Sequence, residues 1–153
     1  LHPSARLGFV IAPAPLAQRV ARLKTVVSRQ NDNLAQEALA GWMAEGGFER
    51  HLRRMRRHYE ARRRAMSQAL AEWDPQPPIH LPQGGMCFWL DTGVDSQKLS
   101  ELVRKDGVEV QPGAAYRLDG QPSQHLRLGF AHPTIQEIQE GLALLGRARA
   151  TLL

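Results

Sequence analysis

The stretch His125-Leu126-Arg127-Leu128-Gly129-Phe130-Ala131 carries the clearest structural signal in the chain. Its apolar residues Leu126, Leu128 and Phe130 alternate with other residues, so they fall on one face and Arg127 falls on the opposite face. A period of two is typical of a β-strand that buries one face. This stretch therefore predicts a sheet with a core on one side and an arginine on the other.

The neighbouring sequence completes a small unit of strands and helices. Met86-Cys87-Phe88-Trp89-Leu90 predicts a second strand with both aromatic residues in the core, and Val108-Glu109-Val110 predicts a short third strand. One helix is expected over residues 96–106, closed by Gly107, and another after the capping-box pair Thr134 and Glu137. The predicted fold class is α/β, of the α+β kind: a small sheet flanked by helices that begins near residue 78.

The first 46 residues predict a different kind of structure. The apolar run at residues 7–12 ends at Pro13 and favours a strand. Two helices are expected after it, one that begins at Pro15 and runs to Val27 and one from a cap at Asp32 or Asn33 to Gly46-Gly47. Because a lone strand cannot form a sheet, we expect this part of the chain to be a fragment of a larger domain.

The positive charge of the chain is concentrated in one long predicted helix, residues 47–73. The chain has 20 Lys and Arg against 15 Asp and Glu, and this helix holds eight arginines and three glutamates, so it carries the whole net charge of +5. Its apolar residues form one stripe and its arginines occupy the other faces, which favours a solvated connecting helix. The alternatives are an electrostatic role for another part of the molecule and direct nucleic-acid contact. A proline-rich linker over residues 74–78 is expected to end it.

Length and composition exclude several classes of protein. With 153 residues, 42% hydrophobic and 23% charged, the chain has the composition of a globular domain and not of a disordered or collagen-like one. No window of 18 apolar residues occurs, so we expect no membrane-spanning helix, and the six histidines lack metal-ligand spacing. Cys87 is the only cysteine, which excludes an internal disulfide and fits a reducing, cytoplasmic location.

Three residues are candidates for ligand binding from their chemistry and position. Arg127 lies mid-strand with the side-chain-free Gly129 beside it, and its planar guanidinium suits a carboxylate or a phosphate. Arg6, at the start of the apolar run, raises the same possibility. Gly85 can let a ligand approach the backbone closely. The alternatives are two solvated arginines and an ordinary glycine turn.

Four motifs follow one another along the chain: residues 3–13, Gly84-Gly85-Met86 with Phe88-Trp89-Leu90, Gly107-Val108 with Pro112-Gly113, and residues 126–131. In order and spacing they resemble the stretch after the cofactor lysine and the small-domain landmarks of class I and II, fold-type-I, pyridoxal-phosphate aminotransferases. Within that family, residues 36–40, 51–56 and 59–63 look most like MocR-type regulators of the GntR family, which fuse an aminotransferase-like domain to an N-terminal winged helix-turn-helix domain.

The resemblance implies a role for each candidate residue. Arg6 would bind the phosphate of pyridoxal 5'-phosphate, Arg127 would bind the carboxylate of an amino acid or 2-oxo acid ligand, and Gly85 would lie near the ligand's backbone. No catalytic residue is assigned, because the Schiff-base lysine would lie two residues before Leu1. Without that lysine the chain is expected to be inactive on its own.

The resemblance also implies a division into domains and leaves two functions open. Residues 1–46 would end the large cofactor-binding domain, residues 47–73 would form the connecting helix, and residues 78–153 would form the small domain. The favoured function is the amino-acid- or cofactor-sensing effector domain of a GntR/MocR-type transcription regulator, which binds DNA only through a separate N-terminal domain. The alternative is a free-standing amino-acid aminotransferase. In either case we expect a cytoplasmic homodimer that does not contact the membrane.

Overall fold

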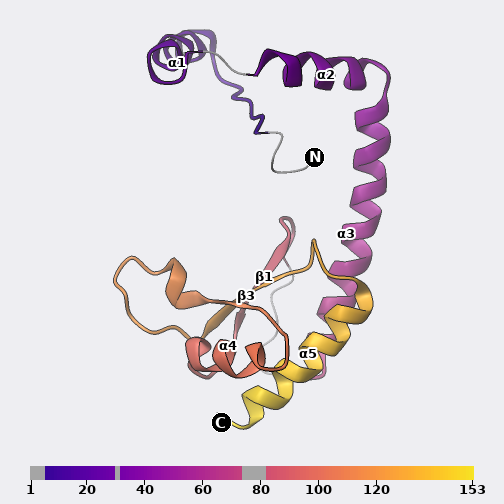
Figure 1. Ribbon diagram of the computed structural model, residues 1–153, viewed down its shortest axis with the longest axis vertical. Coiled ribbons are helices and arrows are strands. Elements are labelled where there is room, and N and C mark those ends of the chain that lie inside the picture. Colours follow the sequence, from indigo (N-terminus) through magenta and orange to yellow (C-terminus); the bar gives the residue numbers. More distant parts are fainter. Residues whose placement is uncertain (1–5, 30–31, 74–81) are drawn as a thin grey trace. The chain divides into compact units, whose positions relative to one another are not determined.

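The computed structural model describes residues 6–29, 32–73 and 82–153. The chain divides into two compact units, Leu1–Arg54 and Met55–Leu153. Helices α1 (Ala14–Val27) and α2 (Asn33–Ala44) belong to the first unit, and α3 (Gly47–Ala71) begins there and continues into the second (Figure 1). The predicted linker at residues 74–78 lies outside the described residues.

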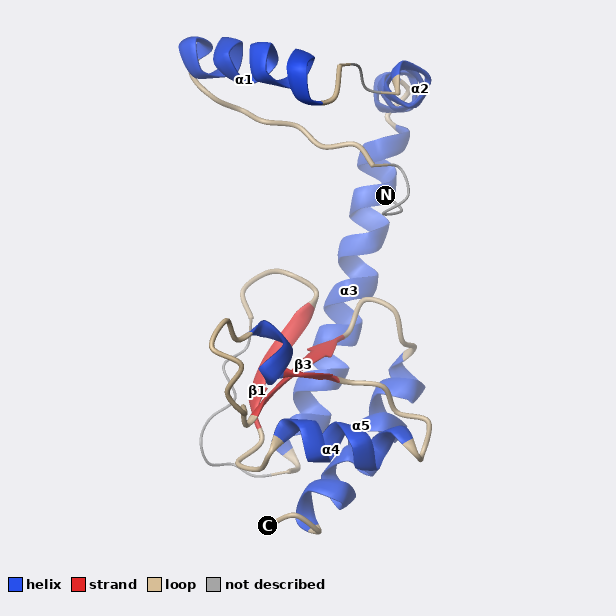
Figure 2. Ribbon diagram, turned by 60° about the vertical axis from the view of Figure 1, so that its left-hand side comes forward, coloured by secondary structure: helices blue, strands red, loops and turns tan. Residues whose placement is uncertain are grey.

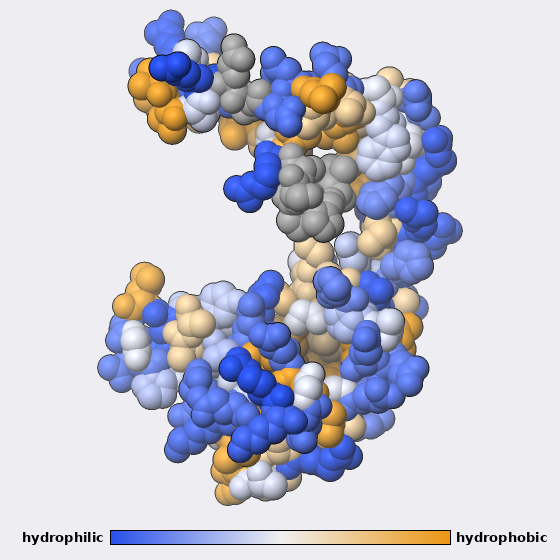
Figure 3. Space-filling model, viewed as in Figure 1, coloured by the Kyte–Doolittle hydropathy of each residue, from blue (hydrophilic) through white to orange (hydrophobic). Residues whose placement is uncertain are grey.

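The first unit consists of helices with exposed apolar side chains. Helices α1 and α2 contain no buried residue, and Figure 3 shows apolar atoms at their surface. The predicted strand over residues 7–12 is wrong: no strand forms there, and Phe9 and Ile11 are 89% and 90% exposed. Strands need a hydrogen-bonded neighbour, and the described part of this unit contains no other extended segment that could provide one.

The helix boundaries in the first unit follow the expected local signals. The Asp32 carboxylate caps α2 by accepting a hydrogen bond from the Ala35 N–H at 3.0 Å, which confirms one of the two predicted caps. The α2–α3 junction needs two glycines. Gly46 has a φ of +70°, and a Cβ on Gly47 would lie 2.1 Å from Nε1 of Trp42.

The second unit contains a three-stranded antiparallel sheet (Figure 2). Its strands are β1 (Cys87–Asp91), β2 (Gln111–Pro112) and β3 (His125–Gly129), in the spatial order β1-β3-β2. The central strand β3 lies within the stretch that the alternating pattern predicted. Its neighbour β1 pairs with it in register over all five residues, and β2 pairs with it over two.

One face of this sheet is covered by helices and forms the core. Side chains of β1 and β3 pack there against α4 (Ser96–Arg104), α5 (Ile135–Ala150) and the C-terminal part of α3. The Thr134–Glu137 capping box at the start of α5 is confirmed. The core residues are Met66, Leu70, Phe88, Leu90, Val94, Leu99, Val103, Leu126, Leu128, Phe130, Ile138, Leu142 and Leu145.

The third strand lies later in the chain than predicted. The Val108 N–H donates to the Val103 carbonyl at 3.0 Å, and Gly107 has a φ of +80°, so the backbone here closes the C-terminus of α4. The strand pairing therefore begins only at Gln111. Both Val108 and Val110 are partly buried against the core, which explains why their alternation resembles a strand.

Candidate functional site

Arg127 lies at the centre of the sheet face that the helices leave uncovered. Its neighbours in the strand, Leu126 and Leu128, point into the core, so the Arg127 side chain leaves from the opposite face, as predicted. Trp89 of β1 is its register partner on one side and Gln111 of β2 is its partner on the other. These three residues form a row across the sheet.

Arg127 is half-buried as a residue, and its guanidinium forms a solvent-exposed hydrogen bond to a neutral partner. Its Nη1 donates a hydrogen bond to Oε1 of Gln111 at 2.8 Å, and the Tyr116 hydroxyl donates to the same oxygen. No Asp or Glu among the described residues lies within salt-bridge distance of Arg127. The charge of Arg127 is thus not neutralised by a described residue, and the remaining N–H groups can bind an anion.

Aromatic rings lie next to Arg127 on the same face. The Trp89 ring contacts Tyr116 edge-to-face, with centroids 5.6 Å apart, and stacks on His125 at 5.4 Å and an interplanar angle of 19°. Trp89 is 52% exposed, so its predicted core position is wrong, whereas Phe88 is 1% exposed and confirms its own. The alternation of side chains along β1 explains both outcomes, because adjacent strand residues point to opposite faces of the sheet.

Gly85, which is predicted to lie near the ligand, and Gly129, the neighbour of Arg127 in the strand, both lie in open surroundings. Gly129 is the register partner of Cys87, and a Cβ on it would meet only the Met86 carbonyl oxygen, at 4.0 Å. Gly85 precedes β1 and has a φ of +82°, which favours glycine; no atom lies within 4 Å of where its Cβ would be. Both positions therefore leave space at the β1–β3 end of the sheet.

Arg6 lies in the first unit, where its side chain is exposed and its φ is +48°, in the left-handed region that non-glycine residues rarely adopt. Arg127 lies in the second unit. That the two arginines act on one ligand stays a prediction.

Two arginines of α3 stabilise the second unit. Nη1 of Arg62 donates to the Ala131 carbonyl just after β3, and Nη1 of Arg63 donates to the Pro82 carbonyl at 3.3 Å. Glu60 pairs with Arg63 at 3.3 Å and with Arg64 at 2.8 Å, and the hydrogen bonds from Arg64 and Arg63 lower the pKa of its carboxyl group. Part of the positive charge on α3 therefore serves packing.

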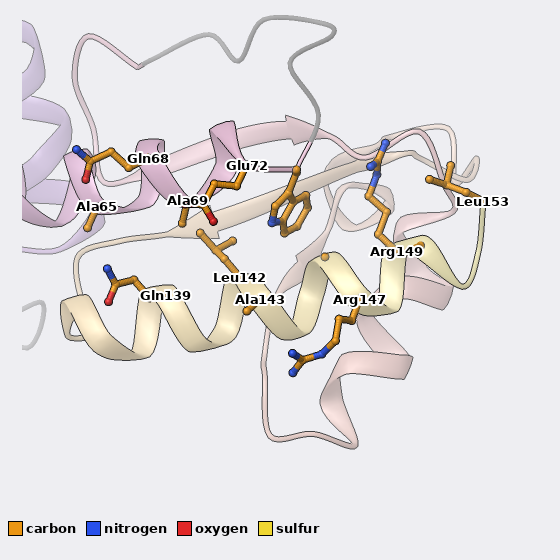
Figure 4. A pocket seen from close by; sticks show the side chains of 13 residues that line it. Ala65, Gln68, Ala69, Glu72, Gln139, Leu142, Ala143, Arg147, Arg149 and Leu153 are labelled. Atoms are coloured by element: carbon orange, nitrogen blue, oxygen red, sulfur yellow. The ribbon is translucent and has the colours of Figure 1, made fainter.

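A separate cavity of about 870 Å³ lies between the end of α3 and α5 (Figure 4). The residues that line it include the polar Glu72, Gln139 and Arg147 and the apolar Leu142 and Leu153. Its lining does not include Arg127. Elsewhere in the described residues, no group of three His, Cys, Asp or Glu side chains could hold a metal ion.

The family model for aminotransferase class I and II matches residues 3–145. The chain belongs to this family. The chain is 30% identical to the HTH-type transcriptional regulator TauR of Rhodobacter capsulatus, covering 97% of this chain and 31% of that protein. It is also 30% identical to the 2-aminoadipate transaminase of Thermus thermophilus, covering all of this chain and 39% of that protein.

A solved structure gives the same result for the fold. The α-aminoadipate aminotransferase LysN of Thermus thermophilus, complexed with N-(5'-phosphopyridoxyl)-L-leucine, superposes with a TM-score of 0.83 at 29% identity, covering 98% of this chain and 39% of that one. The resemblance and the fold class are confirmed, and so is pyridoxal phosphate as the cofactor of the family. The chain spans between about three and four tenths of the length of these relatives.

Gln111, Tyr116 and His125 complete the face around Arg127, and the sequence did not indicate them as site residues. Gln111 meets Arg127 across 16 residues of sequence, which requires the β2–β3 pairing. The alternation of Phe88, Trp89 and Leu90 was the one available signal, because it puts Trp89 on the face that carries Arg127.

Proposed function

We propose that this chain is the C-terminal part of an aminotransferase-like domain whose Arg127 binds the carboxylate of an amino acid or a 2-oxo acid. The observation that carries the proposal is the state of the Arg127 guanidinium. It lies on the uncovered face of the sheet, and its hydrogen-bond partner there is the neutral amide of Gln111. A planar guanidinium without a carboxylate partner is suited to bind a ligand carboxylate with two parallel hydrogen bonds.

The other candidate residues take complementary roles in this proposal. Arg6 binds the phosphate of pyridoxal phosphate, because a guanidinium matches the geometry of phosphate oxygens. Gly85 leaves space for the ligand's backbone, since its surroundings are open. Pyridoxal phosphate, when bound, supplies the electron sink for chemistry at the ligand's α-carbon. Residues 1–46 end the large domain, residues 47–73 connect the domains, and residues 78–153 form the small domain.

We further propose that the intact protein is a transcription regulator of the GntR/MocR type and that this domain senses an amino acid or the cofactor. The similarity to TauR and to other HTH-type transcriptional regulators, YdfD and YisV of Bacillus subtilis, supports this function. Such a protein binds DNA through an N-terminal domain and acts as a homodimer in the cytoplasm. A free-standing amino-acid aminotransferase is the second candidate, supported by the similarity to the 2-aminoadipate transaminase.

One experiment on the intact protein separates the two candidates. The protein, loaded with pyridoxal phosphate, is mixed with each of the standard amino acids. Its affinity for a DNA fragment from upstream of its own gene and the formation of a 2-oxo acid are both measured. A regulator changes its DNA affinity when one amino acid is added, whereas a free aminotransferase forms the 2-oxo acid and binds no DNA.

The variant Arg127→Lys tests the carboxylate role in either case. Lysine keeps the positive charge but loses the planar fork, so we expect the affinity for the amino acid to fall about tenfold or more. Lys98→Arg is the matched control, because it also replaces one cationic side chain by the other, at a position on α4. It should leave the affinity unchanged. Unchanged affinity in Arg127→Lys would overturn the proposal.

A further inference from the structure

We propose that Gln111 is a positioning residue that holds the Arg127 guanidinium for the ligand carboxylate without neutralising it, and that Tyr116 holds Gln111. This inference rests on the proposed function of Arg127 and extends it to two residues. Gln111 Oε1 receives the hydrogen bond from Arg127 Nη1 at 2.8 Å and also the one from the Tyr116 hydroxyl.

The orientation of the Gln111 amide follows from the chemistry of its partner. A guanidinium carries only hydrogen-bond donors, so the atom that faces Arg127 has to be the carbonyl oxygen of the amide. That oxygen has two lone pairs, and the two donors, Arg127 and Tyr116, use both. The amide is therefore held in one orientation, and it in turn restricts where the guanidinium lies.

The backbone keeps Gln111 and Tyr116 in place beside β3. Gln111 is the register partner of Arg127, and Gly113 begins the 3₁₀ turn that ends at Tyr116. Gly113 packs so tightly on β3 that a Cβ on it would lie 2.7 Å from the His125 carbonyl oxygen. The ring of Tyr116 also packs edge-to-face against the ring of Trp89. Each member of this chain of contacts is thus fixed by a neighbour.

That the Gln111 side chain is uncharged matters for ligand binding as much as its position does. A carboxylate at this place would form an ion pair with Arg127 and compete with the ligand for the same N–H groups. An apolar side chain would leave the guanidinium without a partner and free to adopt other rotamers, which adds an entropic cost to ligand binding. A glutamine both restricts the guanidinium and leaves its positive charge available.

The test measures selectivity for a carboxylate in the intact, cofactor-free protein. Two probes are titrated by calorimetry: N-(5'-phosphopyridoxyl)-L-leucine and its counterpart without the carboxylate, N-(5'-phosphopyridoxyl)-3-methylbutylamine. The selectivity ratio is the dissociation constant of the amine probe divided by that of the leucine probe. It reports the carboxylate contact alone. A residue with a merely structural role would change both constants together and leave the ratio unchanged.

Three variants and one control have definite expected results. In Gln111→Glu the ratio should fall about tenfold or more, and in Gln111→Leu about two- to tenfold, while the dissociation constant of the amine probe stays the same. Tyr116→Phe keeps the ring on Trp89 and removes the hydroxyl, so the ratio should fall less than in Gln111→Leu. Gln139→Glu makes the same charge change on the exposed surface of α5 and should leave the ratio unchanged.

The outcomes distinguish this inference from the proposed function. If Arg127→Lys lowers the ratio but Gln111→Glu and Tyr116→Phe do not, the positioning role is wrong and the role of Arg127 stands. If Arg127→Lys leaves the ratio unchanged, the proposed function fails and the inference fails with it. Because Tyr116→Phe removes one exposed hydroxyl, it keeps the test valid even if a Gln111 variant does not fold.

Discussion

The close contact between Gly113 and β3 gives a quantitative prediction for the substitution Gly113→Ala. The new Cβ would lie 2.6 Å from Oγ of Ser123 and 2.7 Å from the His125 carbonyl oxygen. The serine side chain can rotate, but the carbonyl oxygen belongs to the first residue of β3 and cannot move without disturbing the sheet. Overpacking of this kind costs about 1–3 kcal/mol. We therefore expect the free energy of unfolding to fall by about that amount.

The matched control is Gly129→Ala on the same sheet. A Cβ there would meet only the Met86 carbonyl oxygen at 4.0 Å, and Gly129 does not have a positive φ. Alanine at such a position reduces the conformational entropy of the unfolded chain and stabilises a protein by about 0.4–1 kcal/mol. The two glycine-to-alanine substitutions should therefore change stability in opposite directions.

Urea unfolding of the 153-residue chain, followed by circular dichroism, measures both effects. The unfolding midpoint of Gly113→Ala should lie below that of the wild type, and the midpoint of Gly129→Ala should lie at or above it, with the slope m unchanged. A Gly113→Ala midpoint equal to that of the wild type would show that the turn carrying Gln111 and Tyr116 is not packed on β3 as described.

Two further predictions concern the stability of the second unit. Leu126→Ala removes a fully buried side chain and should lower the free energy of unfolding by about 2–5 kcal/mol, whereas Leu118→Ala, at a fully exposed leucine, should change it by less than about 0.5 kcal/mol; similar urea midpoints for the two variants would contradict the core assignment. Glu137 accepts the Thr134 N–H, and this hydrogen bond lowers its pKa from the ordinary value of 4.5, so its contribution to stability is complete above that value and is lost as the pH falls through the lowered pKa. The difference in urea midpoint between the wild type and Glu137→Gln should therefore be present at about pH 7 and shrink at about pH 3, and a difference that grows on acidification would contradict the capping box.

The second unit could be predicted well from sequence because its signals are local. The alternation in residues 125–131 indicated β3 and the face of Arg127, and the pair Thr134 and Glu137 indicated the start of α5. Both signals act over a few residues, where backbone geometry decides the pattern. The helices of the first unit were predicted for the same reason, from Asp32 as a cap and from the glycines before α3.

The errors have two causes: contacts between distant parts of the sequence, made or missing, and a local hydrogen bond at the end of α4. The apolar run at residues 7–12 has the composition of a strand, but strand formation depends on a neighbour that the described chain does not supply. Val108 and Val110 alternate like a strand, yet the Val108 N–H closes α4. Gln111 and Tyr116 could not be recognised as site residues, because only the β2–β3 pairing brings them to Arg127.

The most direct test of the central claim is a crystal structure of the intact protein with N-(5'-phosphopyridoxyl)-L-leucine bound. We predict that the ligand carboxylate lies against the uncovered face of the sheet and accepts two hydrogen bonds of about 2.7–2.9 Å from Arg127, with Arg6 at the phosphate. A ligand whose carboxylate contacts other residues, with Arg127 paired to an acidic side chain of the protein, would contradict the account.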